Sequence, residues 1–115
     1  MKDTGIYSGD FNCRADVERE YNVAIAKNIR IVYAGYWYRD YSGNSVVLFK
    51  QGRKLYEVRG GHCSCDGLGG QWEPEEVNKD QMMHMLENGA YYDNCKDEIM
   101  KVMGWDRPKT KSTKG

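Results

Sequence analysis

The stretch from Gly61 to Pro74, which reads GHCSCDGLGGQWEP, concentrates side chains that are able to do chemistry. Two of the four cysteines of the chain lie two positions apart here, directly after a histidine. In extended backbone, residues two apart point to the same side, so both thiols can face one metal ion. A structural zinc ion takes four such ligands in tetrahedral geometry. The candidate ligands are Cys63, Cys65, His62 and Cys95, with Cys13 as an alternative to Cys95.

Three interpretations of this stretch compete: a zinc site, a catalytic thiol, and a strand end with buried cysteines. The Cys-x-Cys spacing differs from the gap typical of structural zinc sites, and no second close pair follows. His62 and Cys63 are neighbours on an expected strand and point to opposite faces, so they do not form a base and nucleophile pair. Cysteine is among the residues most often buried, so we favour the third interpretation, in which Trp72 anchors the following turn against the sheet. It predicts no bound metal, no cofactor and no catalytic activity.

The composition indicates one small domain with an uneven distribution of charge. The chain has 115 residues, 40% of them hydrophobic, and a formal net charge of zero. Residues 1–65 carry a net charge of +3, residues 66–106 a net charge of −7, and the remaining tail a net charge of +4. The strong basic field of a nucleic-acid-binding domain is lacking, so a nucleic-acid partner is not expected. No apolar run is long enough for a secretion signal or a membrane span, which predicts a cytoplasmic protein with reduced cysteines.

Hydrophobic periodicity and turn residues predict the elements that position these side chains. Apolar side chains at helical spacing predict a helix over 14–27, although alternation over 21–25 also fits a strand. β-Branched and aromatic residues predict strands over 29–38, 46–50 and 54–59, and the short turns between them imply antiparallel pairing. Two further helices are expected, one from Pro74 to about Glu87 and one over 91–103 that ends at Gly104.

The expected fold is therefore α+β, a three-stranded antiparallel sheet packed against two C-terminal helices, with an N-terminal helix. Residues 1–106 form the single domain, the first 13 residues are irregular, and residues 107–115 form a disordered basic tail. Simple alternation assigns the side chains of the first strand to two faces, and both faces have large apolar side chains. We expect helices to cover one face and a second copy or a partner to cover the other, so a homodimer is possible. The first face holds Ile29, Ile31, Tyr33 and Trp37, and the second holds Val32, Tyr36 and Tyr38.

Five short motifs between residues 38 and 76 resemble a stretch in small, mostly uncharacterised proteins encoded by bacteriophages and mobile elements. The motifs are Tyr41-Ser42-Gly43, Val47-Leu48-Phe49, Leu55-Tyr56-Glu57-Val58, His62-Cys63-Ser64-Cys65 and Gly70-Gln71-Trp72-Glu73-Pro74-Glu75-Glu76. The resemblance covers about a third of the chain. It implies a phage origin and, by analogy with other small phage accessory proteins, an anti-CRISPR-like inhibitor that blocks a host defence or regulatory protein in the host cytosol.

Two groups of side chains are candidates for contact with such a partner, because tyrosine and tryptophan are frequent interface anchors and acidic residues attract a basic partner. Neighbours on a strand point to opposite faces, so at least one ring of the aromatic group should be exposed or half exposed unless the sheet is covered on both sides. Ordinary core packing is the competing interpretation of the rings. A small zinc-stabilised module and a nucleotide or small-molecule binder that sequesters a defence signal are the alternative functions. The aromatic group is Tyr36, Trp37, Tyr38 and Tyr41, and the acidic group is Glu75, Glu76, Asp80 and Glu87.

Overall fold

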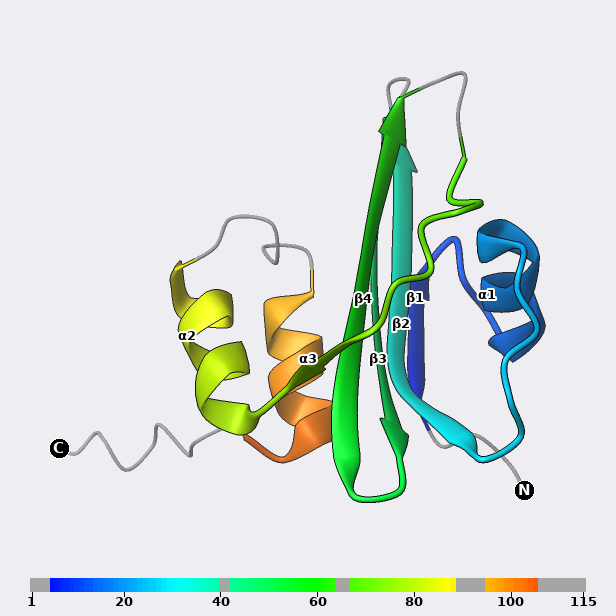
Figure 1. Ribbon diagram of the computed structural model, residues 1–115. Coiled ribbons are helices and arrows are strands. Elements are labelled where there is room, and N and C mark those ends of the chain that lie inside the picture. Colours follow the sequence, from blue (N-terminus) through cyan, green and yellow to red (C-terminus); the bar gives the residue numbers. More distant parts are fainter. Residues whose placement is uncertain (1–4, 40–41, 64–66, 89–94, 106–115) are drawn as a thin grey trace, which may run out of the picture.

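The computed structural model describes residues 5–39, 42–63, 67–88 and 95–105, which form a five-stranded mixed sheet and three helices (Figure 1). The strands lie in the order β1-β2-β3-β4-β5, and each pairs with its neighbour in sequence. The elements are β1 (Ile6–Gly9), α1 (Arg14–Tyr21), β2 (Ile29–Arg39), β3 (Ser42–Gln51), β4 (Lys54–Cys63), β5 (Glu75–Val77), α2 (Lys79–Asn88) and α3 (Lys96–Met103).

The central part of the sheet is the predicted meander. β2, β3 and β4 pair antiparallel along almost their whole length, which confirms that part of the prediction. Gly52 has a φ of 65° in the two-residue turn between β3 and β4, a conformation that glycine adopts at little cost. The α+β class holds, but the three-stranded antiparallel sheet is wrong. β1 adds a parallel strand beside β2, within a segment expected to be irregular, and β5 adds an antiparallel strand beside β4.

The N-terminal helix is shorter than predicted. α1 ends at Tyr21 instead of continuing to Lys27. The backbone of Asn22 is left-handed, with a φ of 57°, and its N–H donates to the carbonyl of Arg19. Asparagine tolerates this conformation better than most residues, and the resulting turn closes a Schellman motif. The alternating residues after Tyr21 therefore belong to an extended loop, and the apolar spacing alone did not reveal the stop.

The start of the second helix is also displaced from its predicted position. Pro74 does not open a helix; it precedes the short strand β5, and α2 begins at Lys79. Asn78 provides the cap, since its Oδ1 accepts from the Gln81 N–H at 2.8 Å and its own N–H donates to Gln81 Oε1 at 2.9 Å. This reciprocal pair is a capping box, and the Asn-x-x-Gln spacing in the sequence was a signal for it.

The third helix ends where the sequence predicted, although it begins later. α3 starts at Lys96, and residues 91–94 of the predicted helix lie outside the described residues. Gly104 has a φ of 74° and donates to the carbonyl of Lys101, while the N–H of Trp105 donates to Met100. These two bonds form a Schellman cap, so the predicted stop at Gly104 is confirmed. The predicted basic tail also lies outside the described residues.

A β-bulge at Val32 changes which side chains share a face of the sheet. Ile31 pairs with Phe49, but Tyr33 pairs with the next residue along β3, Leu48. A bulge adds one residue and reverses the alternation beyond it. Ile31 therefore faces α1, whereas Tyr33 and Trp37 pack on the side of α2 and α3. The predicted face that joined Ile31 to Tyr33 and Trp37 is wrong for this reason.

Both faces of the sheet are covered, by α1 on one side and by α2 and α3 on the other (Figure 1). On the α1 face, Phe11, Val17 and Tyr21 are buried against the strands. On the α2/α3 face, the core includes Met82 and Ile99. The expectation of a sheet face left open for a second copy or a partner is therefore wrong. None of the helices in the described ranges is long and apolar enough to cross a membrane.

Candidate functional site

Three rings meet where β2 and β4 finish, at the upper end of the sheet in Figure 1; we call Tyr36, Tyr38 and His62 the aromatic end. Tyr38 on β2, Gly43 on β3 and His62 on β4 are cross-strand partners in one row. Because Gly43 has no side chain, the two flanking rings meet above it, edge to face, with centroids 5.1 Å apart. A methyl group added at Gly43 would lie 2.5 Å from His62 Nε2, so glycine is required for this contact.

The tyrosines of the aromatic end differ in burial. Tyr36 is 5% exposed and packs against Phe11, with ring centroids 5.2 Å apart. Its hydroxyl lies 2.6 Å from His62 Nε2, which holds the imidazole beside the Tyr36 ring. Among the described residues, Tyr38 is the one large hydrophobic side chain that is exposed, with 46% of its surface open to solvent. The expectation that at least one ring would be exposed is met by Tyr38.

The predicted aromatic group is only partly brought together. Tyr36 and Tyr38 share the aromatic end, whereas Trp37 lies on the other face of the sheet, half-buried against the α2/α3 core. Tyr41 lies outside the described residues. His62 joins the rings instead, although the sequence had indicated it only as a possible zinc ligand. Its place follows from the register of three strands, which neither the motif nor its spacing reveals.

The predicted acidic residues lie along β5 and α2, and two of them already have cationic partners. Glu75 is 3.6 Å from Arg59, and Glu76 is 3.5 Å from Lys54. Asp80 is in the first turn of α2, where a carboxylate complements the helix dipole. Glu87 is exposed near the end of the same helix. The acidic surface is therefore partly neutralised within the protein.

The conditional zinc site is not assembled as its residues suggested. His62 belongs to the aromatic end on the α1 face, whereas Cys95 is buried in the core on the α2/α3 face. The sheet separates them, so the structure does not bring these two predicted ligands together. The side chain of Cys63 and the whole of Cys65 lie outside the described residues. Within the described parts of the chain, no group of three or more His, Cys, Asp or Glu side chains has the arrangement of a metal site.

Cys95 is a structural residue rather than a reactive thiol. Burial, with a further contribution from the negative charges of Glu98 and Glu57, raises the pKa of Cys95 to about 12. Such a thiol is protonated at neutral pH, and the thiolate is the nucleophilic form. The neighbouring Tyr33 hydroxyl donates to Glu98 Oε1 at 2.9 Å, which joins β2 to α3. This cluster holds the helix on the sheet.

The segment after the cysteines completes the edge of the sheet. The N–H of Gly61 on β4 donates to Gln71 Oε1 at 2.9 Å, and Gln71 Nε2 donates to the carbonyl of Gly67 at 3.0 Å. Trp72 stacks on Phe49 with an interplanar angle of 10° and meets Tyr21 edge to face. The prediction that Trp72 anchors this turn on the sheet is confirmed. The Gly-Gln-Trp motif thus has a structural explanation.

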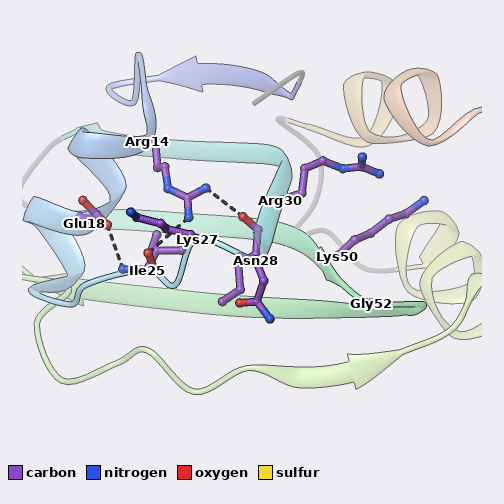
Figure 2. Close-up of a pocket in the computed structure, with 9 residues that line it drawn as sticks. Arg14, Glu18, Ile25, Lys27, Asn28, Arg30, Lys50 and Gly52 are labelled. Atoms are coloured by element: carbon purple, nitrogen blue, oxygen red, sulfur yellow. Dashed lines mark hydrogen bonds between the residues drawn. The ribbon is translucent and has the colours of Figure 1, made fainter. Parts of the chain in front are cut away.

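A groove of about 770 Å³ lies between the α1–β2 loop and the end of the sheet where β2 begins and β3 finishes (Figure 2). Arg14 donates to three carbonyls that include Ala26 at 2.6 Å and Ile29 at 3.0 Å, and Glu18 accepts from the Ile25 N–H. These two charged groups hold the loop. The complete lining is Arg14, Glu18, Ile25, Lys27, Asn28, Ile29, Arg30, Lys50 and Gly52.

Two cations at the edge of this groove form a like-charged pair. Arg30 and Lys50 are cross-strand partners on β2 and β3, and Figure 2 shows both extending in one direction, away from Arg14 and Glu18. Like charges that face each other across a strand pair are destabilising. Within the described residues, neither cation has a carboxylate partner. The pair is a candidate for contact with an anion.

The chain was compared with protein-family models, with curated proteins and with solved structures. None of the three comparisons found a match. The resemblance to phage-encoded proteins therefore stays a prediction.

Proposed function

We propose that this protein is a non-catalytic binding protein and that its aromatic end contacts a partner protein. The observation that carries the proposal is Tyr38, a large ring that is 46% exposed on an otherwise well-covered sheet. Tyrosine is enriched among the residues that dominate binding energy at interfaces. An exposed ring beside His62 offers both apolar area and hydrogen-bonding groups to a partner.

The packing beneath Tyr38 supports this role. Its ring touches His62, and His62 is bonded to the Tyr36 hydroxyl, which in turn is held by the buried Tyr36 ring. A side chain that is already held in place loses little conformational entropy on binding. The aromatic end is therefore a preorganised contact surface.

The class of partner follows from the resemblance to phage-encoded proteins. We propose a host defence or regulatory protein that is blocked by occupation of its surface. Such a mechanism needs no catalytic residue in this chain. Asp80 and Glu87 are the acidic residues best suited to steer a basic partner, because Glu75 and Glu76 already have cations beside them.

The test is an affinity pull-down from a bacterial host lysate, followed by affinity measurements with the captured protein. Tyr38→Ala should weaken binding by about 1–4 kcal/mol, the range of interface anchors, without loss of the fold. Arg53→Ala, at the opposite end of the meander, is the control and should bind as the unmodified protein does. Equal binding by both variants would contradict the proposal.

A phosphate-bearing small molecule is the second candidate ligand, and the Arg30–Lys50 pair favours it. A guanidinium beside an ammonium suits a phosphate group, and occupation would relieve the repulsion between them. Thermal-shift measurements with ATP and with inorganic phosphate test this function. Stabilisation by either compound that disappears in Arg30→Gln and persists in Arg53→Gln would support it, whereas no stabilisation would contradict it.

A further inference from the structure

Two carboxylates lie beside the aromatic end. The N–H of Asp10 donates to the carbonyl of Tyr36 at 2.7 Å, which fixes Asp10 against β2 at the level of the buried ring. Glu20 comes from the last turn of α1, on the same face of the sheet. Burial of the ring, followed by the negative charges of Glu20 and Asp10, raises the pKa of Tyr36. Both carboxylates therefore act on the hydroxyl that holds His62.

Among the side chains that the structure describes, the nearby positive charge does not balance these carboxylates. Arg19 is 2.9 Å from Asp16 and 3.6 Å from Glu20, so one guanidinium serves two acidic groups. The side chain of Arg19 is also largely exposed, where an ion pair is weak. In the described part of the chain, Asp10 has no cation as a partner. Asp10 and Glu20 therefore place negative charge beside Tyr36, whose ring centroid lies 6.4 Å from that of the exposed Tyr38.

This combination selects one kind of partner group. The face of a tyrosine ring attracts a cation, and a guanidinium stacks on it more readily than an ammonium because it is planar and weakly hydrated. Carboxylates accept charge-assisted hydrogen bonds from the same group. An acidic or phosphorylated segment would instead be repelled by Asp10 and Glu20. An apolar segment would gain nothing from them.

We propose that the aromatic end recognises a basic segment of the partner protein, with an arginine placed over Tyr38 and its positive charge facing Asp10 and Glu20. This inference rests on the proposed function, since it names the chemistry of the partner at the same surface. It also gives the acidic side chains around Tyr36 a role that the fold does not require.

The test uses a capped Gly-Arg-Gly-Arg-Gly peptide and a matched peptide in which neutral citrulline replaces each arginine. Binding is followed through the NMR resonances of Tyr38 and His62. The arginine peptide should shift both resonances, and added salt should weaken the binding of this peptide. The double variant Asp10→Asn with Glu20→Gln should bind about tenfold more weakly, a loss comparable to one or two rim charges. The control variant Asp97→Asn, which removes an exposed carboxylate from α3 on the other face of the sheet, should bind normally.

Three results would overturn the inference: no shift with the arginine peptide, equal shifts with the citrulline peptide, or unchanged binding by the double variant. The proposed function fails on a different result, namely partner capture that does not depend on Tyr38. If Tyr38→Ala abolishes partner capture but the protein does not bind the arginine peptide, the proposed function is supported and only the inference of a basic partner segment is contradicted.

Discussion

The aromatic end and the acidic β5–α2 surface are both exposed, yet the protein prepares them differently for a partner. At the aromatic end, Tyr38 is held by His62 and Tyr36, and its own contacts leave almost half of it open to solvent. On the acidic surface, Glu75 and Glu76 already pair with cations of β4. A partner can use the first surface as it stands, whereas at β5 it must compete with Arg59 and Lys54.

This difference shows why exposed charges and exposed aromatic area contribute differently to the free energy of binding. Exposed ion pairs contribute roughly 0–1 kcal/mol and are screened by salt. A fixed ring keeps its apolar area in any salt concentration and offers it without reordering. Binding energy should therefore concentrate at the aromatic end, with the charges of α2 affecting mainly the rate of encounter.

The largest expected effect separates the two tyrosines of the aromatic end. Tyr36→Ala removes a nearly buried ring that contacts Phe11 and His62, so it should lower the free energy of unfolding by about 3–5 kcal/mol. Tyr38→Ala removes a half-exposed ring and should lower it by about 1 kcal/mol or less. Urea denaturation monitored by circular dichroism measures both. Equal losses would show that Tyr38 belongs to the core.

A second variant disturbs the aromatic end while keeping every ring. Gly43→Ala places a methyl group against His62 and within 3.1 Å of Tyr36, so it should displace the imidazole, lower stability by about 1–3 kcal/mol and weaken partner binding. Gly61→Ala is the matched control on the adjacent strand, because its added methyl group meets atoms only at 3.4 Å or beyond. Urea denaturation and partner affinity measure the pair. Full binding by Gly43→Ala would argue against preorganisation.

Alkaline pH should act on the interior, at α3, rather than on the acidic surface. The folded pKa of Cys95 is raised to about 12 from an ordinary value of 9.0, so the folded state holds this proton more tightly than the unfolded state. The resulting stability is complete below pH 9 and is lost as the pH rises toward 12, by about 2 kcal/mol at pH 10.5. Cys95→Ala should be less stable at pH 7 but should lose less stability between pH 9 and 10.5. Parallel pH curves for the two proteins would contradict the assignment.

The smallest effect is expected on the acidic surface itself. Glu76→Gln removes a carboxylate whose partner Lys54 is 3.5 Å away, with both side chains more than half exposed. It should change the free energy of unfolding by about 0.5 kcal/mol or less, and partner affinity by a similarly small amount. Thermal denaturation and the pull-down assay measure these changes. A loss of binding as large as that of Tyr38→Ala would move the contact surface to β5.

Some of the fold could be predicted from local sequence, and the rest depended on contacts that local sequence does not show. The central meander followed from β-branched runs and short turns, and Gly104 marked the end of α3 correctly. β1 has four residues and pairs with β2 across an intervening helix, so no short-range pattern reveals it. Pro74 and the glutamates around it resemble the start of a helix, but the helix begins after the capping box of Asn78, four residues later.

The candidate site shows the same division. The presence of an exposed aromatic ring could be predicted, because Tyr36 and Trp37 must point to opposite faces of a strand. The bulge at Val32 determines which face each residue occupies, and bulges leave little trace in sequence. His62 meets Tyr38 only because the register of β3 places Gly43 between them. The sequence therefore indicated that an aromatic surface exists, but not which residues form it.

Photo-crosslinking at two positions tests the location of the contact surface most directly. Benzoylphenylalanine is placed at position 38 in one protein and at position 87, on α2, in another, and each is irradiated in the host lysate. Because the ring at position 38 lies in the proposed interface, we expect it to crosslink to the same partner that the unmodified protein captures, and position 87 to give no such product. Crosslinks to that partner from position 87, with none from position 38, would contradict the assignment of binding to the aromatic end.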